Sequence, residues 1–188
     1  MSTSKRVLTA ALKVFSQHGL AATTKEIALE AGVNEVTLFR QFESKQNLIA
    51  AVKLEMLRHQ AQSLARLDLE NPDLPRDITR IATAYDRSVS RYMGFIRALI
   101  SQPAKRKLRD TIATEAIEAF RSRFHEYLRS AQRRGLIRDI DLSPAMDVFI
   151  GMIFSGALRR HLRRQPYSRS TYLKMCVDLF LRSVRKCK

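Results

Sequence analysis

Apolar residues recur along the chain three and four positions apart, the spacing that places side chains on one face of an α-helix. Two clear examples are Leu8, Ala11, Leu12 and Phe15, and then Phe120, Phe124 and Leu128. No stretch of useful length alternates apolar and polar residues, as a half-buried strand does. The pattern predicts about nine helices, near residues 4–18, 24–31, 35–41, 44–68, 75–92, 94–102, 105–134, 144–164 and 168–186.

Glycine and proline are sparse and lie where the helical pattern is interrupted. The 188-residue chain has only 6 glycines and 5 prolines. A β-sandwich or barrel needs many turns built from these residues. The sequence therefore predicts an all-α fold, in which Gly94 separates the fifth helix from the sixth.

The chain is strongly basic, with 34 Lys and Arg against 18 Asp and Glu, a formal net charge of +16. A charge of this size favours a polyanionic partner, of which nucleic acid is the first candidate. The excess is uneven, because residues 1–50 carry a net +2 and residues 51–188 a net +14. Most of the positive charge thus lies outside the N-terminal helices.

The cysteines and the apolar runs exclude several protein classes. Cys176 and Cys187 are eleven residues apart, about 16 Å along one helix, which is too far for a disulfide. Two thiols alone cannot complete a zinc site. The N-terminal residues lack the apolar segment of a signal peptide. The longest mainly apolar run, Val148–Leu158, is eleven residues long and too short to cross a bilayer, so we expect a soluble, cytoplasmic protein.

The most informative motif lies between residues 23 and 45. Thr23 and Glu26 have the spacing of a capping box, which begins a short helix. Gly32 permits the left-handed backbone of a sharp turn, and Asn34 is a favourable N-cap for the next helix. The intervening small and apolar residues have the spacing of a helix-turn-helix, although a plain helical hairpin has a similar pattern.

Three segments of the N-terminal part are similar in order, spacing and residue type to one family. They are AALKVFSQHG at 10–19, TTKEIA at 23–28 and AGVNEVTLFRQFESKQNL at 31–48. Together they resemble the DNA-binding part of the tetracycline-repressor-like (TetR/AcrR) family, over roughly residues 5–52. Phe39 stands where that family usually has a tyrosine, so the phosphate contact of a tyrosine hydroxyl is lost here.

The resemblance implies an N-terminal three-helix DNA-binding domain, residues 1–48, and a helical effector-binding and dimerisation domain, residues 49–188. It implies a cytoplasmic homodimeric repressor that a small-molecule effector releases from double-stranded DNA. We expect a palindromic operator, since a two-fold dimer presents two identical recognition helices. The alternatives are an architectural or nucleoid-associated DNA-binding protein without an effector, and a helical protein-interaction module.

The second helix of the motif carries the residues that we expect to read DNA. Its apolar residues Leu38 and Phe42, four apart, face the domain core and leave the other side for the major groove. Arg40 can pair with guanine, Gln41 with adenine, and Glu35 can accept from cytosine N4. A lysine at the start of the following helix suits a phosphate. The predicted DNA-binding residues are Thr24, Glu35, Val36, Thr37, Phe39, Arg40, Gln41 and Lys45.

Bulky side chains occupy many apolar positions after residue 70. Such a stripe is more often core than pocket, but part of it must line any effector cavity, since ligand cavities are mostly apolar. The candidate ligand-binding residues are Tyr85, Phe95, Phe120, Phe124 and Tyr127.

The segment 146–158 is apolar on nearly all sides, which indicates a helix buried on both faces. With the last helix it predicts a four-helix dimer core, although a central helix of a monomer has the same pattern. The candidate interface residues are Phe149, Gly151, Met152, Ser155, Gly156, Met175 and Leu179.

The sequence has no pattern typical of an enzyme. The four histidines are dispersed, and none belongs to a His-x-x-x-His or Glu-x-x-His motif. Glycine-rich phosphate loops and the Gly-x-Ser-x-Gly motif are absent. We therefore expect no catalytic activity, no metal and no cofactor.

Overall fold

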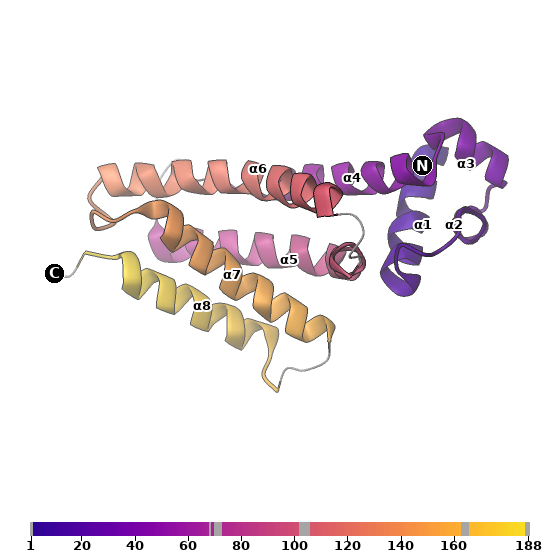
Figure 1. Ribbon diagram of the computed structural model, residues 1–188. Coiled ribbons are helices and arrows are strands. Elements are labelled where there is room, and N and C mark those ends of the chain that lie inside the picture. Colours follow the sequence, from indigo (N-terminus) through magenta and orange to yellow (C-terminus); the bar gives the residue numbers. More distant parts are fainter. Residues whose placement is uncertain (1, 68, 70–72, 102–105, 163–165, 187–188) are drawn as a thin grey trace. The chain divides into compact units, whose positions relative to one another are not determined.

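The computed structural model describes residues 2–67, 69, 73–101, 106–162 and 166–186, without the side chains of 106–119. These residues form eight α-helices and no named strand, which confirms the all-α prediction (Figure 1). The helices are α1 (Thr3–His18), α2 (Thr24–Ala31), α3 (Glu35–Phe42), α4 (Lys45–Ala65), α5 (Leu74–Ile100), α6 (Arg106–Arg133), α7 (Leu142–His161) and α8 (Arg169–Val184).

The chain divides into two compact units. Unit 1 comprises Met1–Arg58 and Arg91–Glu115, and unit 2 comprises His59–Ser90 and Ala116–Lys188. Helices α4, α5 and α6 therefore each contribute to both units. The functional division expected after residue 48 stays a prediction.

The core of unit 1 extends beyond the three N-terminal helices. Its buried apolar residues come from α1 to α3, from the first half of α4 and from the end of α5. The ring centroids of Phe15 in α1 and Phe95 in α5 are 6.0 Å apart. The large buried members are Phe15, Ile27, Leu38, Phe42, Leu48, Met56, Tyr92 and Phe95.

Gly94 does not end a helix, so the predicted break at this position is wrong. Helix α5 runs without interruption from Leu74 to Ile100. A Cβ at Gly94 would lie 2.6 Å from the Cβ of Ser16 in α1, closer than two such atoms can approach. Gly94 is therefore required for close packing of α5 against α1, and not for a turn.

The core of unit 2 is a series of contacting aromatic rings. The ring centroids of Tyr85 and Phe120 are 4.7 Å apart, and those of Phe120 and Phe124 are 6.1 Å apart. Phe149 of α7 and Phe180 of α8 continue the series, with centroids 4.4 Å apart. Helices α7 and α8 lie side by side (Figure 1). The ring contacts join these two helices to α5 and α6.

Among the described helices, α7 is the one whose length and composition would suffice to cross a membrane. The helix has 20 residues, more than the apolar run within it. Core helices of soluble proteins pass the same test, and α7 buries Phe149, Ile153 and Ala157 inside unit 2. Its apolar character is therefore weak evidence for a membrane.

Candidate nucleic-acid interface

Helix α2 begins at the predicted capping box. The Thr23 hydroxyl accepts a hydrogen bond from the Glu26 N–H over 3.2 Å, and the Glu26 carboxylate accepts one from the Thr23 N–H over 2.6 Å. The bonds from the Thr23 backbone and then from its hydroxyl hold the pKa of Glu26 below its ordinary value, because they favour the ionised carboxylate. Residues adjacent in sequence thus set the start of α2.

The turn between α2 and α3 is held by an arginine from outside the motif. Gly32 ends α2 with φ 63° and ψ 41°, the left-handed conformation that glycine adopts without strain. Arg6 Nη2 donates hydrogen bonds to the carbonyl oxygens of Ala31 at 2.8 Å and Gly32 at 2.9 Å. Arg6 therefore satisfies carbonyl groups that a helix end leaves without partners.

Helix α3 is anchored through one of its faces. Asn34 Oδ1 accepts a hydrogen bond from the Thr37 N–H at 2.7 Å, which begins the helix as predicted. Leu38 and Phe42 are buried in the core of unit 1, as their spacing of four residues predicts. These two side chains fix the orientation of α3 on the unit.

The other side of α3 is exposed to solvent. Val36 is 75% exposed and Phe39 41%, high values for apolar side chains. Arg40 and Gln41 are also exposed. A guanidinium and a carboxamide match the hydrogen-bonding groups of base edges, and apolar side chains suit the thymine methyl. Four predicted DNA-binding residues therefore lie on the solvent side of one anchored helix.

Thr24 and Glu35, both predicted to contact DNA, lie next to each other. The Thr24 hydroxyl donates a hydrogen bond to Glu35 Oε1, and both residues are partly buried. This bond joins the first residue of α2 to the first residue of α3. The Glu35 carboxylate keeps a second oxygen for a base, but its position is set by Thr24.

The junction between α3 and α4 is a tight, strained turn. Glu43 has φ 62° and ψ −41°, and across it the Ser44 N–H donates to the Phe42 carbonyl oxygen at 2.6 Å. This is a γ-turn, a conformation that residues with a Cβ rarely adopt. The Ser44 hydroxyl then accepts from the Asn47 N–H at 3.1 Å and caps α4. Lys45, partly buried, is the first residue of that helix.

Two residues that build this region were not found by sequence reasoning. Arg6 lies 25 positions before Ala31, so nothing local signals their contact. Glu43 follows α3 directly, but a glutamate gives no sign of a positive φ. Both contribute to the orientation of the motif and not to its exposed face.

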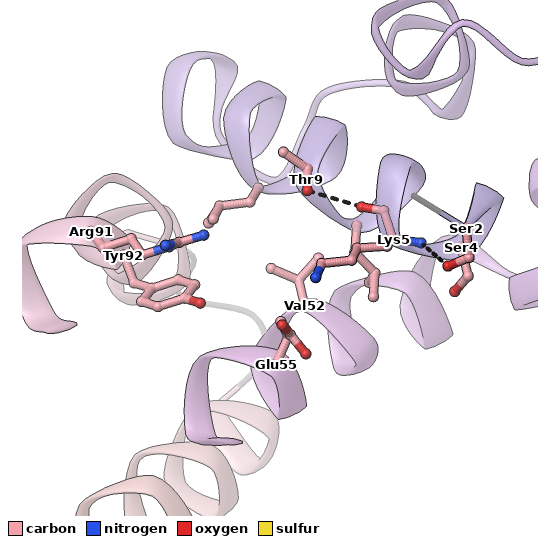
Figure 2. A pocket seen from close by; sticks show the side chains of 10 residues that line it. Ser2, Ser4, Lys5, Thr9, Val52, Glu55, Arg91 and Tyr92 are labelled. Carbon is pink, nitrogen blue, oxygen red and sulfur yellow. Dashed lines mark hydrogen bonds between the residues drawn. The ribbon is translucent and has the colours of Figure 1, made fainter. Parts of the chain in front are cut away.

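A small pocket of about 290 Å³ lies in unit 1 between α1, α4 and α5 (Figure 2). Its charged lining residues are Lys5, Glu55 and Arg91, and the Arg91 guanidinium carbon lies 5.7 Å from the centre of the Tyr92 ring. None of its lining residues belongs to α2 or α3. The pocket is at the small end of the range for ligand sites and is separate from the exposed side of α3.

The five candidate ligand-binding residues are all buried, but they do not form one group. Tyr85, Phe120 and Phe124 belong to the ring series of unit 2, and the Tyr127 hydroxyl donates to Asp77 Oδ2 at 3.1 Å. Phe95 packs on Phe15 in unit 1, so its grouping with the other four is wrong. None of the five lines the three grooves described in unit 2.

The candidate dimer residues separate into exposed and internal positions. Met175 is 56% exposed and Leu179 49%, and a Cβ at Gly151 would meet no atom within 4 Å. Met152 and Ser155 are partly exposed. In contrast, two of the candidates lie inside unit 2, namely Phe149 and Gly156.

Phe149 and Gly156 are used within the chain and offer no surface to a second copy. Phe149 packs on the rings of Phe124 and Phe180. A Cβ at Gly156 would lie 2.3 Å from the ring of Tyr172, so this glycine lets α8 approach α7. The expectation that these two residues form an interface is therefore corrected. An apolar helix pattern does not distinguish burial inside one chain from burial between two copies.

Within the described ranges, no three His, Cys, Asp or Glu side chains gather where a metal ion could bind. Cys176 is buried, which raises the pKa of its thiol. Cys187 lies outside the described residues.

Comparisons with known proteins agree with this geometry. Residues 7–52 match the model of the tetR family of bacterial regulatory proteins. The uncharacterized HTH-type transcriptional regulator YvkB of Bacillus subtilis is 30% identical over 161 residues, which cover 84% of this chain and 82% of that protein.

Solved structures share the fold at lower sequence identity. The fatty acid degradation regulator FadR of Bacillus halodurans gives a TM-score of 0.81 at 15% identity, with 96% of this chain and 95% of that chain covered. The TetR family transcriptional regulator PfmR of Thermus thermophilus gives 0.70 at 22% identity, with 94% and 97% covered. The chain belongs to the TetR family of DNA-binding bacterial transcriptional regulators.

Proposed function

We propose that the protein binds a palindromic operator as a homodimer and represses transcription until a small-molecule effector releases it. The observation that carries the DNA-reading role is the two-sided character of α3. Leu38 and Phe42 hold the helix on the core, while Val36, Arg40 and Gln41 remain exposed. A helix anchored in this way can enter the major groove without loss of buried contacts.

Selection of bound sites from random duplexes, followed by footprinting, tests this role. We expect one preferred site with two-fold symmetry, because two copies present identical α3 helices. The half-sites will lie about 34 Å apart, one turn of the duplex, or a multiple of it. Recovery of no preferred site, or of a site without symmetry, would contradict the proposal.

The second candidate function is architectural DNA binding without an effector. The observation that favours it is the net charge of +14 on residues 51–188, which attracts any duplex. Competition between the selected site and random duplex at a fixed salt concentration separates the two functions. A specific regulator prefers its site by about a thousandfold or more, whereas an architectural protein binds both duplexes with similar affinity.

We propose that the exposed apolar face of α7 and α8 is the dimer contact. Val148 of α7 is 63% exposed, and Met175 and Leu179 of α8 are about half exposed. A groove of about 390 Å³ lies on this face and is lined by Val148, Met152 and Leu179 among others. Gly151 lies one turn from Val148, and its missing side chain permits a close approach of a second helix.

We place the effector in unit 2 and propose that its binding lowers operator affinity. This requires that the effector prefer a dimer geometry in which the two α3 helices are wrongly spaced. By reciprocity, the operator must weaken effector binding by the same factor by which the effector weakens operator binding. The coupling free energy is typically about 1–3 kcal/mol. A ligand screen by thermal shift, followed by titration with and without operator, measures both effects. Equal affinity of every ligand for free and operator-bound protein would exclude effector release.

A further inference from the structure

A groove of about 510 Å³ lies between α5 and α8 within unit 2. Its lining includes three cationic side chains, Arg87 of α5 with Arg169 and Lys174 of α8. Two buried apolar residues of α8, Leu173 and Val177, also line it. None of the aromatic rings in the core of unit 2 lines this groove, so it is distinct from the aromatic core.

The charge is graded along this groove. Arg169 Nε lies 2.6 Å from Asp86 Oδ2, which places the start of α8 beside Asp86 and its neighbour Arg87. Asp178, the acidic residue of the lining, comes nine positions later in α8, about 13 Å further along the helix. Arg87 and Arg169 therefore lie at one end of the groove and Asp178 at the other, with Lys174 between them, one helical turn before Asp178.

The cationic end is a built feature and not a set of loose surface side chains. Asp86 is fully buried and contacts two arginines, Arg169 of α8 and Arg160 of α7. Two guanidinium groups therefore share one carboxylate, which leaves an excess positive charge. The contact with Asp86 also holds the Arg169 guanidinium in place at the groove wall, which lowers the entropy lost when a ligand binds.

The two threonine hydroxyls of the groove wall cannot replace these cations as donors. Thr79 Oγ1 donates to the Pro75 carbonyl oxygen at 2.6 Å, and Thr83 Oγ1 donates to the Thr79 carbonyl oxygen at 2.8 Å. Both hydroxyls thus offer a ligand only their acceptor lone pairs. The charged donors for an acidic group come from the cationic side chains, and Ser170 is the further hydroxyl residue of the lining.

We propose that this groove binds a small organic anion with one acidic head group, a carboxylate or a phosphate monoester, and a short apolar body. The head group lies between Arg87, Arg169 and Lys174, and the apolar body covers Leu173 and Val177. Asp178 disfavours a second negative charge at the far end, so a single-headed anion fits better than a polyanion such as DNA. The groove lies in unit 2, where we place the effector, and this proposal rests on that placement to name the ligand class. Binding is measured without DNA, so its failure is distinguishable from a failure of operator binding.

Calorimetric titration of the full chain at constant ionic strength tests the ligand class. Benzoate carries a carboxylate on a phenyl ring, and phenyl phosphate carries a phosphate monoester on the same kind of ring. The two controls are benzyl alcohol, which has the ring but no acidic group, and inorganic phosphate, which has no apolar body. We expect benzoate or phenyl phosphate to bind at least about tenfold more tightly than both controls, the scale of one hydrogen bond to a charged group. Equal binding of benzyl alcohol or of inorganic phosphate would overturn the proposal.

Matched charge variants locate the site. Arg87→Gln and Lys174→Gln remove exposed groove cations, whereas Arg182→Gln removes an exposed cation of α8 outside the groove lining. We expect each groove variant to weaken binding of the preferred aryl anion about tenfold and the control to leave it unchanged. Thermal melts verify that all three variants fold. Equal losses of affinity in all three variants would assign the binding to diffuse charge. Unchanged affinity in the two groove variants would place the binding at another site.

Asp178 supplies the test of the single head group. Terephthalate, with a carboxylate at each end of the ring, will bind the native chain more weakly than benzoate does. Asp178→Asn will narrow this difference, because it removes the negative charge at the far end. If Asp178→Asn leaves the difference in affinity between benzoate and terephthalate unchanged, the proposal of a single-headed anion is wrong. It is also wrong if random-sequence duplex DNA displaces benzoate and this displacement requires Arg87 and Lys174. Neither result bears on operator selection, which is measured by footprinting.

Discussion

Arg40 and Lys45 differ in position, and their contributions to DNA binding should differ in kind. Arg40 is exposed on α3, whereas Lys45 is the partly buried first residue of α4. A side chain on the recognition helix reaches base edges, while one at a following helix start reaches the phosphate backbone. Affinity measured on matched and random duplexes over a salt series separates these roles.

Arg40→Ala should cost about 1–3 kcal/mol on the operator and relax base preference at one position. Lys45→Ala should weaken binding to every duplex and lower the slope of log affinity against log salt by about one. An Arg40→Ala variant that loses equal affinity for operator and random duplex does not read a base. A salt slope that is the same with and without Lys45 excludes the phosphate contact.

Glu26 makes the start of α2 sensitive to acid. Its hydrogen bonds with Thr23 lower the carboxyl pKa, so their contribution to stability is present above the ordinary pKa of 4.5. It is lost as the pH falls through the lower pKa of the folded state. Glu26→Gln keeps an acceptor oxygen but does not titrate, and is the matched control.

Chemical denaturation between pH 7 and pH 3 measures this effect. We expect native protein to be more stable than Glu26→Gln at pH 7 and the difference to shrink below pH 4.5. Thr23→Ala should cost about 1 kcal/mol at pH 7, the usual value of an N-cap. A difference between native and Glu26→Gln that is constant over this range would show that Glu26 does not act through its charge.

At the scale of elements, the same residue type performs opposite tasks. Gly32 ends α2 because its φ is 63°, whereas Gly94 lies inside α5 because a side chain would collide with Ser16. Alanine normally stabilises a helix interior by about 1 kcal/mol relative to glycine. At position 94 the collision should reverse the sign, since overpacking costs about 1–3 kcal/mol.

A double-mutant cycle tests this close contact between α5 and α1. Gly94→Ala should lower the melting temperature, although alanine has the higher helix propensity. Ser16→Gly removes the Cβ that the new methyl group meets, and in that background Gly94→Ala should be far less harmful. Additive effects of the two substitutions would show that the helices do not pack closely at this point.

At the scale of the whole molecule, the proposed dimer depends on the exposed face of α7 and α8. Gly151→Arg places a long charged side chain on this face, at a position where an added Cβ would meet no atom within 4 Å. The protomer should therefore fold normally. An unpaired charge buried at the contact costs several kcal/mol, which separates the two copies.

Sedimentation measures the outcome, with circular dichroism to verify the fold. We expect folded monomers of Gly151→Arg under conditions in which the native chain is dimeric. Arg182→Gln, on α8, is the control for a change of charge alone. A folded dimer of unchanged affinity would place the contact elsewhere.

The sequence by itself determined the features that depend on neighbours in the chain. The capping box at Thr23 and Glu26, the left-handed backbone of Gly32 and the cap at Asn34 each depend on residues only a few positions away, although the distant Arg6 also holds the turn. The bounds of α2 and the buried face of α3 follow from these local rules and from helical spacing. The all-α fold follows in the same way from periodicity and from the scarcity of turn residues.

Only the tertiary structure decided which partner each buried residue has. Phe95 and Phe120 are equivalent in the helical pattern, yet one packs in unit 1 and the other in unit 2. Phe149 is internal while its neighbour Val148 is exposed. Spacing determines the face of a helix on which a side chain lies, but the arrangement of distant helices determines what that face meets. The Arg6 contact and the groove of Arg87 and Arg169 join residues 25 or more positions apart, a separation that no local pattern records.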